Sequence, residues 1–388
     1  MKKTAILAIC IAAFIAVSTG CEESANWDSL LETSPPPQIL QPSQALSPST
    51  ESHSHEIDYD AAFRAFAPDT VMIVAGDYTV TWDELFFHIR TNINGMLQTF
   101  GEIHDWTEII YNGMTFAETV LDFAVDNALL YKAVEYGVDV TGAALSAEDL
   151  EYIREDFENA LMQYGSEEAF MRAVWEMDGI SSRELFDYLV SIGNLANATL
   201  RELYGEYGEL LSDEDAAAFT MFDGYLMAKH ILRLRPEEGE DTAITESEEI
   251  LDLLDNYEGD DFESYFDELM QERTDDGDGL ALFPNGYLFQ YGDMVPEFYD
   301  ACVALEIGEY SGIVETSYGY HIIFRKPVDF DEIPAYNYSQ YDFRTLRNIT
   351  AYDMFDSAMY GWKESLTPEF TAEYNSIDFT RVFDLGGH

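Results

Sequence analysis

The apolar positions in the first half of the chain recur at the spacing of helices that bury one face. Between residues 82 and 204, apolar side chains return every three or four positions, which is the repeat of an amphipathic helix. Helices are predicted at 82–100, 115–136, 146–164, 166–178 and 181–204. Gly137, Gly165 and Gly179 are predicted to mark helix ends. Two short apolar runs before the first helix, separated by Ala75-Gly76-Asp77, predict a hairpin.

From Tyr225 onward the pattern changes to short strands mixed with helices. Strands are predicted at 225–234, 287–289, 311–316 and 320–325, and helices at 243–257, 261–273 and 296–305. The resulting order β-α-α-β-α-β-β suits a small four-stranded antiparallel sheet that is covered by helices.

A last helical pattern at 341–366 carries an apolar stripe that one helix cannot bury by itself. The N-terminal helices are the obvious partner for this stripe. We therefore predict an α+β protein, in which a mainly helical domain is built from both chain ends around an inserted domain. The predicted boundaries are 67–222 for the helical domain, 223–327 for the insert and 328–388 for the returning C-terminal part.

The first 21 residues have the pattern of a bacterial lipoprotein signal. Lys2 and Lys3 precede a short apolar run at 5–17, which is too short for a comfortable span of a bilayer. The run ends in Ser18-Thr19-Gly20-Cys21, which resembles a lipobox, whose cysteine becomes diacylated. We therefore predict a signal peptide at 1–21, lipidation of Cys21 and anchoring to the outer face of the cell membrane. An ordinary signal peptide and a retained anchor helix are the alternatives. Residues 22–66 are rich in Ser, Pro, Glu and Gln, which predicts a disordered tether.

The chain is strongly acidic, with 19 basic and 75 acidic residues and a formal net charge of −56. Such a charge repels nucleic-acid phosphates, and no basic patch is visible in the sequence, so nucleic-acid binding is excluded. The charge serves solubility or attracts cationic segments of unfolded partners. Cys302 stands among apolar residues and is interpreted as a core residue. Neither a phosphate-binding glycine loop nor a metal-ligand spacing appears, so no cofactor is predicted.

Four ordered motifs between residues 225 and 326 resemble the parvulin family of peptidyl-prolyl cis-trans isomerases. They are Ala228–Leu232, Gly292–Phe298, Leu305–Ser311 and Tyr318–Ile323. The arrangement of the whole chain also resembles the PrsA and SurA folding factors, because a helical domain formed by both ends flanks the parvulin-like segment. The resemblance is specific over about 100 residues and architectural over the rest.

The parvulin resemblance implies a catalytic set of polar residues. It places His230 and His321 as a pair on neighbouring strands, and Asp276 near the substrate carbonyl. Tyr318 falls where a small hydroxyl residue is common, at the substrate site. As isolated residues, the two histidines would be read as plain core residues. An exposed acid in a very acidic loop is the alternative for Asp276.

The resemblance also implies an apolar slot for the proline ring. Met294 and Phe298 are placed in this slot, and they share a face if their helix begins by Met294. Core packing alone is the alternative for both. Gly286 stands where parvulins commonly carry a pocket-lining leucine, so the slot wall is expected to be rebuilt by Leu288 or Tyr287. This departure from the family pattern puts the peptide preference and the turnover in question.

Three functions fit these observations to different degrees. The first is a peptidyl-prolyl isomerase and foldase for exported proteins, which binds unfolded or partly folded polypeptides and is attached to the membrane by lipid. The second is a holdase chaperone whose parvulin domain is a silent binding module. A solute receptor of a transporter is the third, but it needs repeated βα units, and the strand signals here are confined to about 71–80 and 225–326. A homodimer is compatible with each of these functions.

Overall fold

The computed structural model describes residues 57–236 and 241–385. The predicted signal peptide, the lipidation of Cys21 and most of the predicted tether lie outside these residues. The chain divides into two compact units, of which one is Met1–Leu203 with Phe355–His388 and the other is Tyr204–Met354. The second unit is wider than the predicted insert at 223–327. Among the described residues, no helix is long and apolar enough to cross a bilayer.

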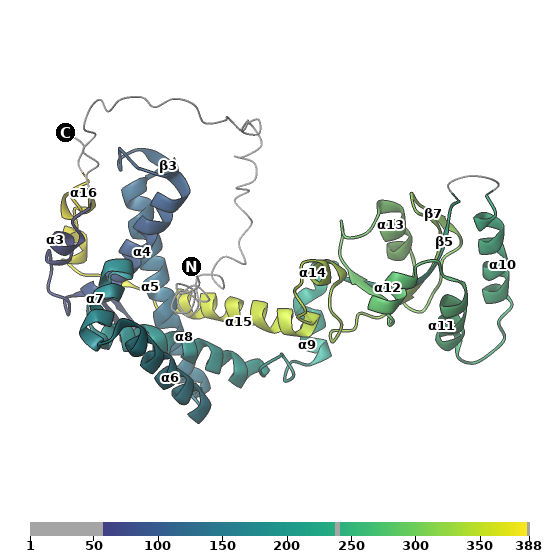
Figure 1. Ribbon diagram of the computed structural model, residues 1–388, viewed down its shortest axis with the longest axis horizontal. Coiled ribbons are helices and arrows are strands. Elements are labelled where there is room, and N and C mark those ends of the chain that lie inside the picture. The colour runs from purple at the N-terminus through teal and green to yellow at the C-terminus, as the bar shows by residue number, and fades with distance from the viewer. Residues whose placement is uncertain (1–56, 237–240, 386–388) are drawn as a thin grey trace. The chain divides into compact units, whose positions relative to one another are not determined.

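The first unit is built mainly from helices, and two of its long helices, at 82–100 and 116–141, pack side by side (Figure 1). Its larger helices are α4 (Trp82–Phe100), α5 (Phe116–Thr141), α6 (Ala147–Tyr164), α7 (Glu167–Asp178) and α8 (Arg183–Tyr204). Shorter elements are α3 (Tyr59–Phe63), β3 (Ile109–Tyr111), β4 (Met114–Thr115), η2 (Tyr374–Ser376) and α16 (Phe379–Val382). A threonine precedes each of the two helices that pack together. Thr81 precedes α4, and Thr115 accepts a hydrogen bond from the Glu118 amide at the start of α5. The predicted helical character of this region is confirmed.

A small sheet joins the two distant parts of the first unit. Strands β1 (Val71–Ala75) and β2 (Tyr78–Thr81) form the predicted hairpin, and β9 (Glu369–Phe370) pairs antiparallel with β1. Ile73 is the register partner of Phe370, and Val74 is that of Glu369. The aromatic side chains of Trp82 and Phe86 and that of Phe383 near the C-terminus share the core beneath this sheet.

Ordered structure begins earlier than the sequence pattern predicts. Helix α3 lies within the segment predicted as a disordered tether, and its Ala62 is fully buried. The indole Nε1 of Trp82 donates a hydrogen bond to the Phe63 carbonyl at 2.7 Å. The Phe66 ring packs edge-on against Trp82. The prediction for 57–66 was therefore wrong, because the apolar side chains in this short stretch are anchored to the core of the first unit.

Gly137 does not end a helix, in contrast to Gly165 and Gly179, which both adopt a left-handed conformation after the last residue of a helix. Helix α5 continues through Gly137 to Thr141. A side chain at Gly137 would place its Cβ 2.4 Å from the indole ring of Trp362. Glycine is required here because the Trp362 ring packs on the helix backbone.

The second unit contains an antiparallel sheet of four strands in the order β6-β5-β8-β7 (Figure 1). The strands are β5 (Leu226–Leu234), β6 (Tyr287–Phe289), β7 (Val314–Glu315) and β8 (Gly319–Lys326). The helical elements are α9 (Asp213–Phe219), η1 (Thr220–Phe222), α10 (Ala243–Asp255), α11 (Phe262–Arg273), α12 (Gly277–Leu282), α13 (Pro296–Ala304) and α14 (Ala335–Ser339). This confirms the predicted α+β class and the four-stranded sheet.

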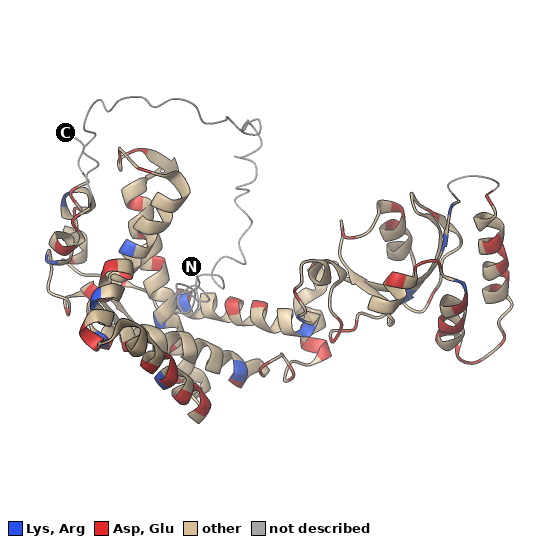
Figure 2. Cartoon of the chain, viewed as in Figure 1, with Lys and Arg blue, Asp and Glu red and all other residues tan. Residues whose placement is uncertain are grey.

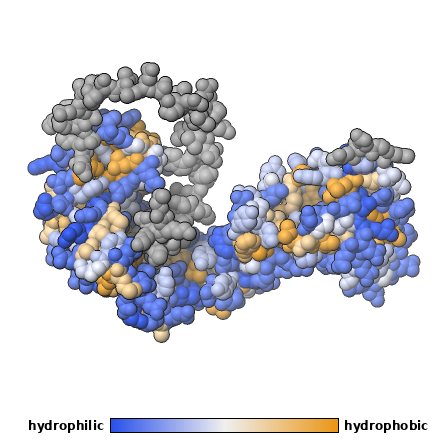
Figure 3. Space-filling view, viewed as in Figure 1, coloured by the Kyte–Doolittle hydropathy of each residue, from blue (hydrophilic) through white to orange (hydrophobic). Residues whose placement is uncertain are grey.

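Side chains alternate between the two faces of this sheet, and each face has its own apolar cluster. On one face, Ile231 and Ile322 pack under α10 and α11. On the other face, Ala228 and Ile323 pack with α13, and the buried thiol of Cys302 belongs to this second cluster. Cys302 is therefore a core residue, as predicted. Figure 2 shows that α10 and α11 carry several acidic residues. Figure 3 shows that the visible surface is mainly hydrophilic with scattered apolar residues.

Helix α15 (Leu346–Ser365) contributes to both units. Its first turns bury Leu346 and Ala351 in an apolar cluster of the second unit. Its last turns belong to the first unit, where Lys363 forms an ion pair with Asp126 at 2.6 Å and the Trp362 ring covers α5.

Candidate functional site

The register of the central strands brings the two predicted histidines together. In the antiparallel pair β5–β8, His230 is opposite Ile323 and Leu232 is opposite His321, so the histidines are diagonal neighbours on one face. Their Nδ1 atoms lie 3.0 Å apart, and the rings are stacked with their centroids 5.2 Å apart. His230 is 8% and His321 is 4% exposed, so the pair is buried in the sheet.

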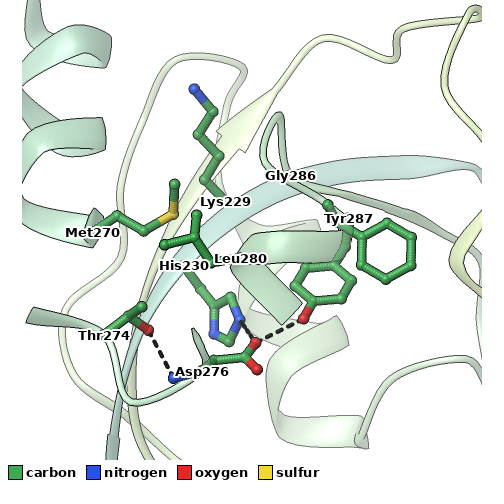
Figure 4. Close-up of a pocket in the computed structure, with 9 residues that line it drawn as sticks. Lys229, His230, Met270, Thr274, Asp276, Leu280, Gly286 and Tyr287 are labelled. Atoms are coloured by element: carbon green, nitrogen blue, oxygen red, sulfur yellow. Dashed lines mark hydrogen bonds and ion pairs between the residues drawn. The ribbon is translucent and has the colours of Figure 1, made fainter. Parts of the chain in front are cut away.

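Asp276 lies at one end of this pair (Figure 4). Its Oδ2 atom is 2.9 Å from His230 Nε2 and accepts a hydrogen bond from the Tyr287 hydroxyl at 2.7 Å. The backbone N–H of Gly279 donates to Oδ1 at 3.1 Å. The hydrogen bond from His230, together with those from Tyr287 and Gly279, lowers the pKa of Asp276 to about 2 although burial opposes this. Asp276 is therefore ionised at neutral pH.

Thr316 lies at the other end of the pair. Its hydroxyl is 2.9 Å from His321 Nε2 and accepts a hydrogen bond from the Tyr318 backbone N–H at 3.1 Å. Burial, and then the neighbouring His230, lowers the pKa of His321 to about 4, so this imidazole is neutral at neutral pH. The four side chains from Asp276 to Thr316 form one continuous chain of polar contacts.

The ionised carboxylate fixes the direction of these hydrogen bonds. Because Asp276 can only accept, the proton of a neutral His230 is on Nε2 and its Nδ1 is an acceptor. His321 then donates from Nδ1 to His230, and its Nε2 accepts from the Thr316 hydroxyl. In this arrangement each of the four ring nitrogens of the two histidines has a hydrogen-bond partner.

Phe298 packs against both imidazoles from α13. Its ring is edge-on to both imidazoles, with its centroid 5.4 Å from that of His230 and 5.5 Å from that of His321. Only 3% of the residue is exposed. Met294 is half-buried and packs in the same apolar cluster as Phe298. The expected helical face shared by these two residues does not form, since α13 begins at Pro296 and Met294 precedes it.

Two predicted substrate residues are not part of this cluster. Leu288 is fully buried on the opposite face of the sheet, where it packs with Met227 and Phe330. The expectation that Leu288 rebuilds the slot wall was therefore wrong, because side chains alternate along β6. Tyr318 is 61% exposed. Its backbone N–H donates a hydrogen bond to the Thr316 hydroxyl, whereas its side chain is largely exposed to solvent.

Thr316 is a site residue that the sequence motifs did not reveal, and Tyr287 was expected there only as the alternative to Leu288 in the slot wall. Figure 4 shows Tyr287 beside Asp276 and His230, at the edge of a small cavity of about 10 Å³ that is also lined by Met270 and Leu280. This is the space of roughly one water molecule. The available signal for Tyr287 was the alternation of side chains between the two faces of β6. This alternation places Tyr287 on the same face as Phe289, which packs in the cluster of Phe298. For Thr316 the signal was its position at the turn of a tight hairpin, two residues after Val314, which is the register partner of His321.

Comparisons with known proteins relate part of the chain to a domain family and the chain to two sequence relatives. Residues 230–326 match the family model of the PPIC-type PPIASE domain, Rotamase. The chain is 40% identical to a foldase protein PrsA of Halalkalibacterium halodurans over 127 residues, which is 32% of this chain and about a third (34%) of that relative. It is 23% identical to a foldase protein PrsA of Caldanaerobacter subterraneus subsp. tengcongensis over 313 residues, which is 79% of this chain and 89% of the relative.

Similar solved structures include two proteins described as peptidylprolyl isomerase (PrsA). The one from Bacillus cereus matches with a TM-score of 0.30 and 14% identity over 82% of this chain and 99% of that chain. The one from Bacillus anthracis matches with a TM-score of 0.23 and 20% identity over 62% of this chain and 95% of that chain. Residues 230–326 therefore match the PPIC-type PPIASE domain, and the chain is similar in sequence to two proteins described as foldase protein PrsA.

Proposed function

We propose that the protein is a peptidyl-prolyl cis-trans isomerase that assists the folding of exported polypeptides. The observation that carries the proposal is the continuous network from Asp276 through His230 and His321 to Thr316, with the Phe298 ring packed against the imidazoles. The relatives named foldase PrsA support the assignment. In this proposal Cys21 carries a lipid anchor on the outer face of the cell membrane, and the clients are unfolded or partly folded chains.

The chemistry requires no covalent step. Rotation about an X–Pro amide crosses a barrier of roughly 18–20 kcal/mol, whereas its cis and trans forms differ by only about 1 kcal/mol. A planar amide carries partial negative charge on its oxygen, and this charge decreases when the twist breaks conjugation. An ionised Asp276 beside the carbonyl would therefore disfavour the planar form more than the twisted one. Phe298 and Met294 would bind the proline ring, and the two imidazoles would form the floor beneath it.

A second candidate is the holdase chaperone. It is favoured by the tightness of the site, where Phe298 and both histidines are almost completely buried and the adjacent cavity has a volume of about 10 Å³. In this alternative the parvulin domain binds polypeptides without accelerating rotation of their X–Pro bonds.

An exchange measurement separates the two candidates. We would measure cis-trans exchange of an X–Pro peptide by NMR with the full mature chain, and compare Asp276→Asn with Asp278→Asn, which changes an exposed neighbouring carboxylate. Asp276→Asn is expected to lower kcat/KM by about tenfold to 100-fold, which corresponds to about 1–3 kcal/mol of transition-state stabilisation. Asp278→Asn is expected to leave it unchanged.

The isomerase proposal is refuted if the wild-type protein leaves the exchange rate unaltered. If it then still suppresses the aggregation of a refolding client, the holdase function is the better description. Equal kcat/KM for wild type and Asp276→Asn would instead remove the carboxylate from the mechanism.

A further inference from the structure

The wall of the site beside Asp276 differs from the common parvulin pattern because of Gly286. The backbone of Gly286 has a φ of +107°, in the region that side chains rarely adopt. A Cβ at this position would lie 2.8 Å from the carbonyl oxygen of Ala228 on the neighbouring strand. A leucine cannot occupy this position without moving β5 or β6. The side chain that faces the site therefore comes from the next residue along the chain, Tyr287.

A second glycine makes room for the Tyr287 hydroxyl. A Cβ added at Gly279 would lie 1.7 Å from the Tyr287 oxygen and 2.3 Å from Asp276 Oδ2. The absence of a side chain at Gly279 thus permits the 2.7 Å hydrogen bond from Tyr287 to Asp276. The Tyr287 ring is held by contacts with Phe283 at 4.8 Å and with His230 at 5.5 Å.

We propose that Tyr287 is a positioning residue of the isomerase site, whose hydroxyl holds the Asp276 carboxylate against His230 and thereby fixes the proton positions along the histidine pair. The hydroxyl and His230 Nε2 reach the same carboxylate oxygen, at 2.7 and 2.9 Å. A carboxylate held by two donors on one oxygen and by the Gly279 N–H on the other cannot rotate without losing a hydrogen bond. The catalytic part of this inference rests on the proposed function, whereas the part that concerns the protons does not.

The test is a comparison of two Tyr→Phe variants in the full mature chain. Tyr287→Phe keeps the ring contacts and removes the hydroxyl. Tyr320→Phe is the matched control, because the Tyr320 hydroxyl also donates to a carboxylate of the same unit, that of Asp241 at 2.8 Å, away from the histidines. Long-range ¹H–¹⁵N NMR at pH 7.5 reports which imidazole nitrogen carries the proton, and kcat/KM is measured on the same samples.

The wild-type protein and Tyr320→Phe are expected to show His230 protonated on Nε2 and His321 protonated on Nδ1. Tyr287→Phe is expected to show mixed tautomers at His230 and a fall in kcat/KM of about tenfold. Gly279→Ala, which keeps the tyrosine but displaces its hydroxyl, is expected to reproduce the mixed tautomers. If Tyr287→Phe retains the wild-type nitrogen shifts at both histidines, the inference is overturned.

Changed tautomers with an unchanged kcat/KM would overturn the catalytic part alone. A wild-type protein without isomerase activity would also remove that part, together with the proposed function, and the nitrogen spectra would still decide whether Tyr287 sets the proton positions.

Discussion

A buried histidine in the first unit should make that unit less stable as the pH falls. His88 on α4 is 4% exposed and lies edge-on against the rings of Phe87 and Tyr131. Burial, with a smaller contribution from the positive charge of Lys132, lowers the pKa of His88 to about 3. In the unfolded chain the His88 imidazole is not buried, so its pKa is about 6.5 there.

The size of the effect follows from these two pKa values. Because the folded-state pKa lies below the unfolded-state value, the contribution of neutral His88 to the free energy of unfolding is fully present above pH 6.5. This contribution is lost as the pH falls toward 3. Well inside this window, each decrease of one pH unit lowers the free energy of unfolding by about 1.4 kcal/mol. Between pH 7 and pH 5, His88 should lower the free energy of unfolding by about 2 kcal/mol.

Urea unfolding followed by tryptophan fluorescence tests this prediction. All four tryptophans in the described part of the chain, at 82, 106, 175 and 362, lie in the first unit, so this signal follows the unit that contains His88. His88→Phe should remove the 2 kcal/mol loss between pH 7 and pH 5, whereas His104→Gln, a change at an exposed histidine, should retain it. The reasoning fails if wild type and His88→Phe lose the same free energy over this range.

Two further changes in the first unit should alter its stability at constant pH. Gly137→Ala places a Cβ 2.4 Å from the Trp362 ring and should lower the free energy of unfolding in urea by about 1–3 kcal/mol. The control Gly95→Ala has open space around the new Cβ on α4, so it should leave the free energy of unfolding unchanged or raise it by about 0.5–1 kcal/mol. Equal effects of the two substitutions would contradict the packing argument. Lys132→Met removes the buried cation that lies 3.0 Å from the Glu84 carboxylate and should lower the free energy of unfolding by about 3 kcal/mol. A loss below about 1 kcal/mol in the same assay would show that water hydrates the carboxylate in place of the lysine.

The catalytic candidates were predictable because they stand in motifs that fix their strand register. His230 and His321 occupy recognisable stretches, and antiparallel pairing of those stretches is sufficient to place them together. Tyr287 was named only as an alternative to Leu288, since it follows a glycine whose backbone geometry only the structure reveals. Leu288 was assigned to the site for the opposite reason: its chemistry suited the slot, but its position in the strand directs it to the other face.

The fold was predictable where the apolar repeat is long. The helices of the first unit and the strand at 226–234 follow from periodicity alone. Strand β9 has two residues and therefore carries no periodic signal. Gly137 shows a different limit: a glycine that leaves room for a distant tryptophan has the same local signature as a glycine that ends a helix.

The pairing of β1 with β9 determines the order in which the chain can complete its folding. Ile73 and its register partner Phe370 are separated by about three quarters of the polypeptide, whereas the residues from 204 to 354 form a contiguous unit. During synthesis from the N-terminus, that contiguous unit can fold before the last strand emerges, while the outer edge of β1 remains uncovered. Contacts of such long sequence separation form slowly, and an open strand edge invites pairing with other chains. A truncation just before residue 369 should therefore leave a chain that aggregates although most of its residues are present.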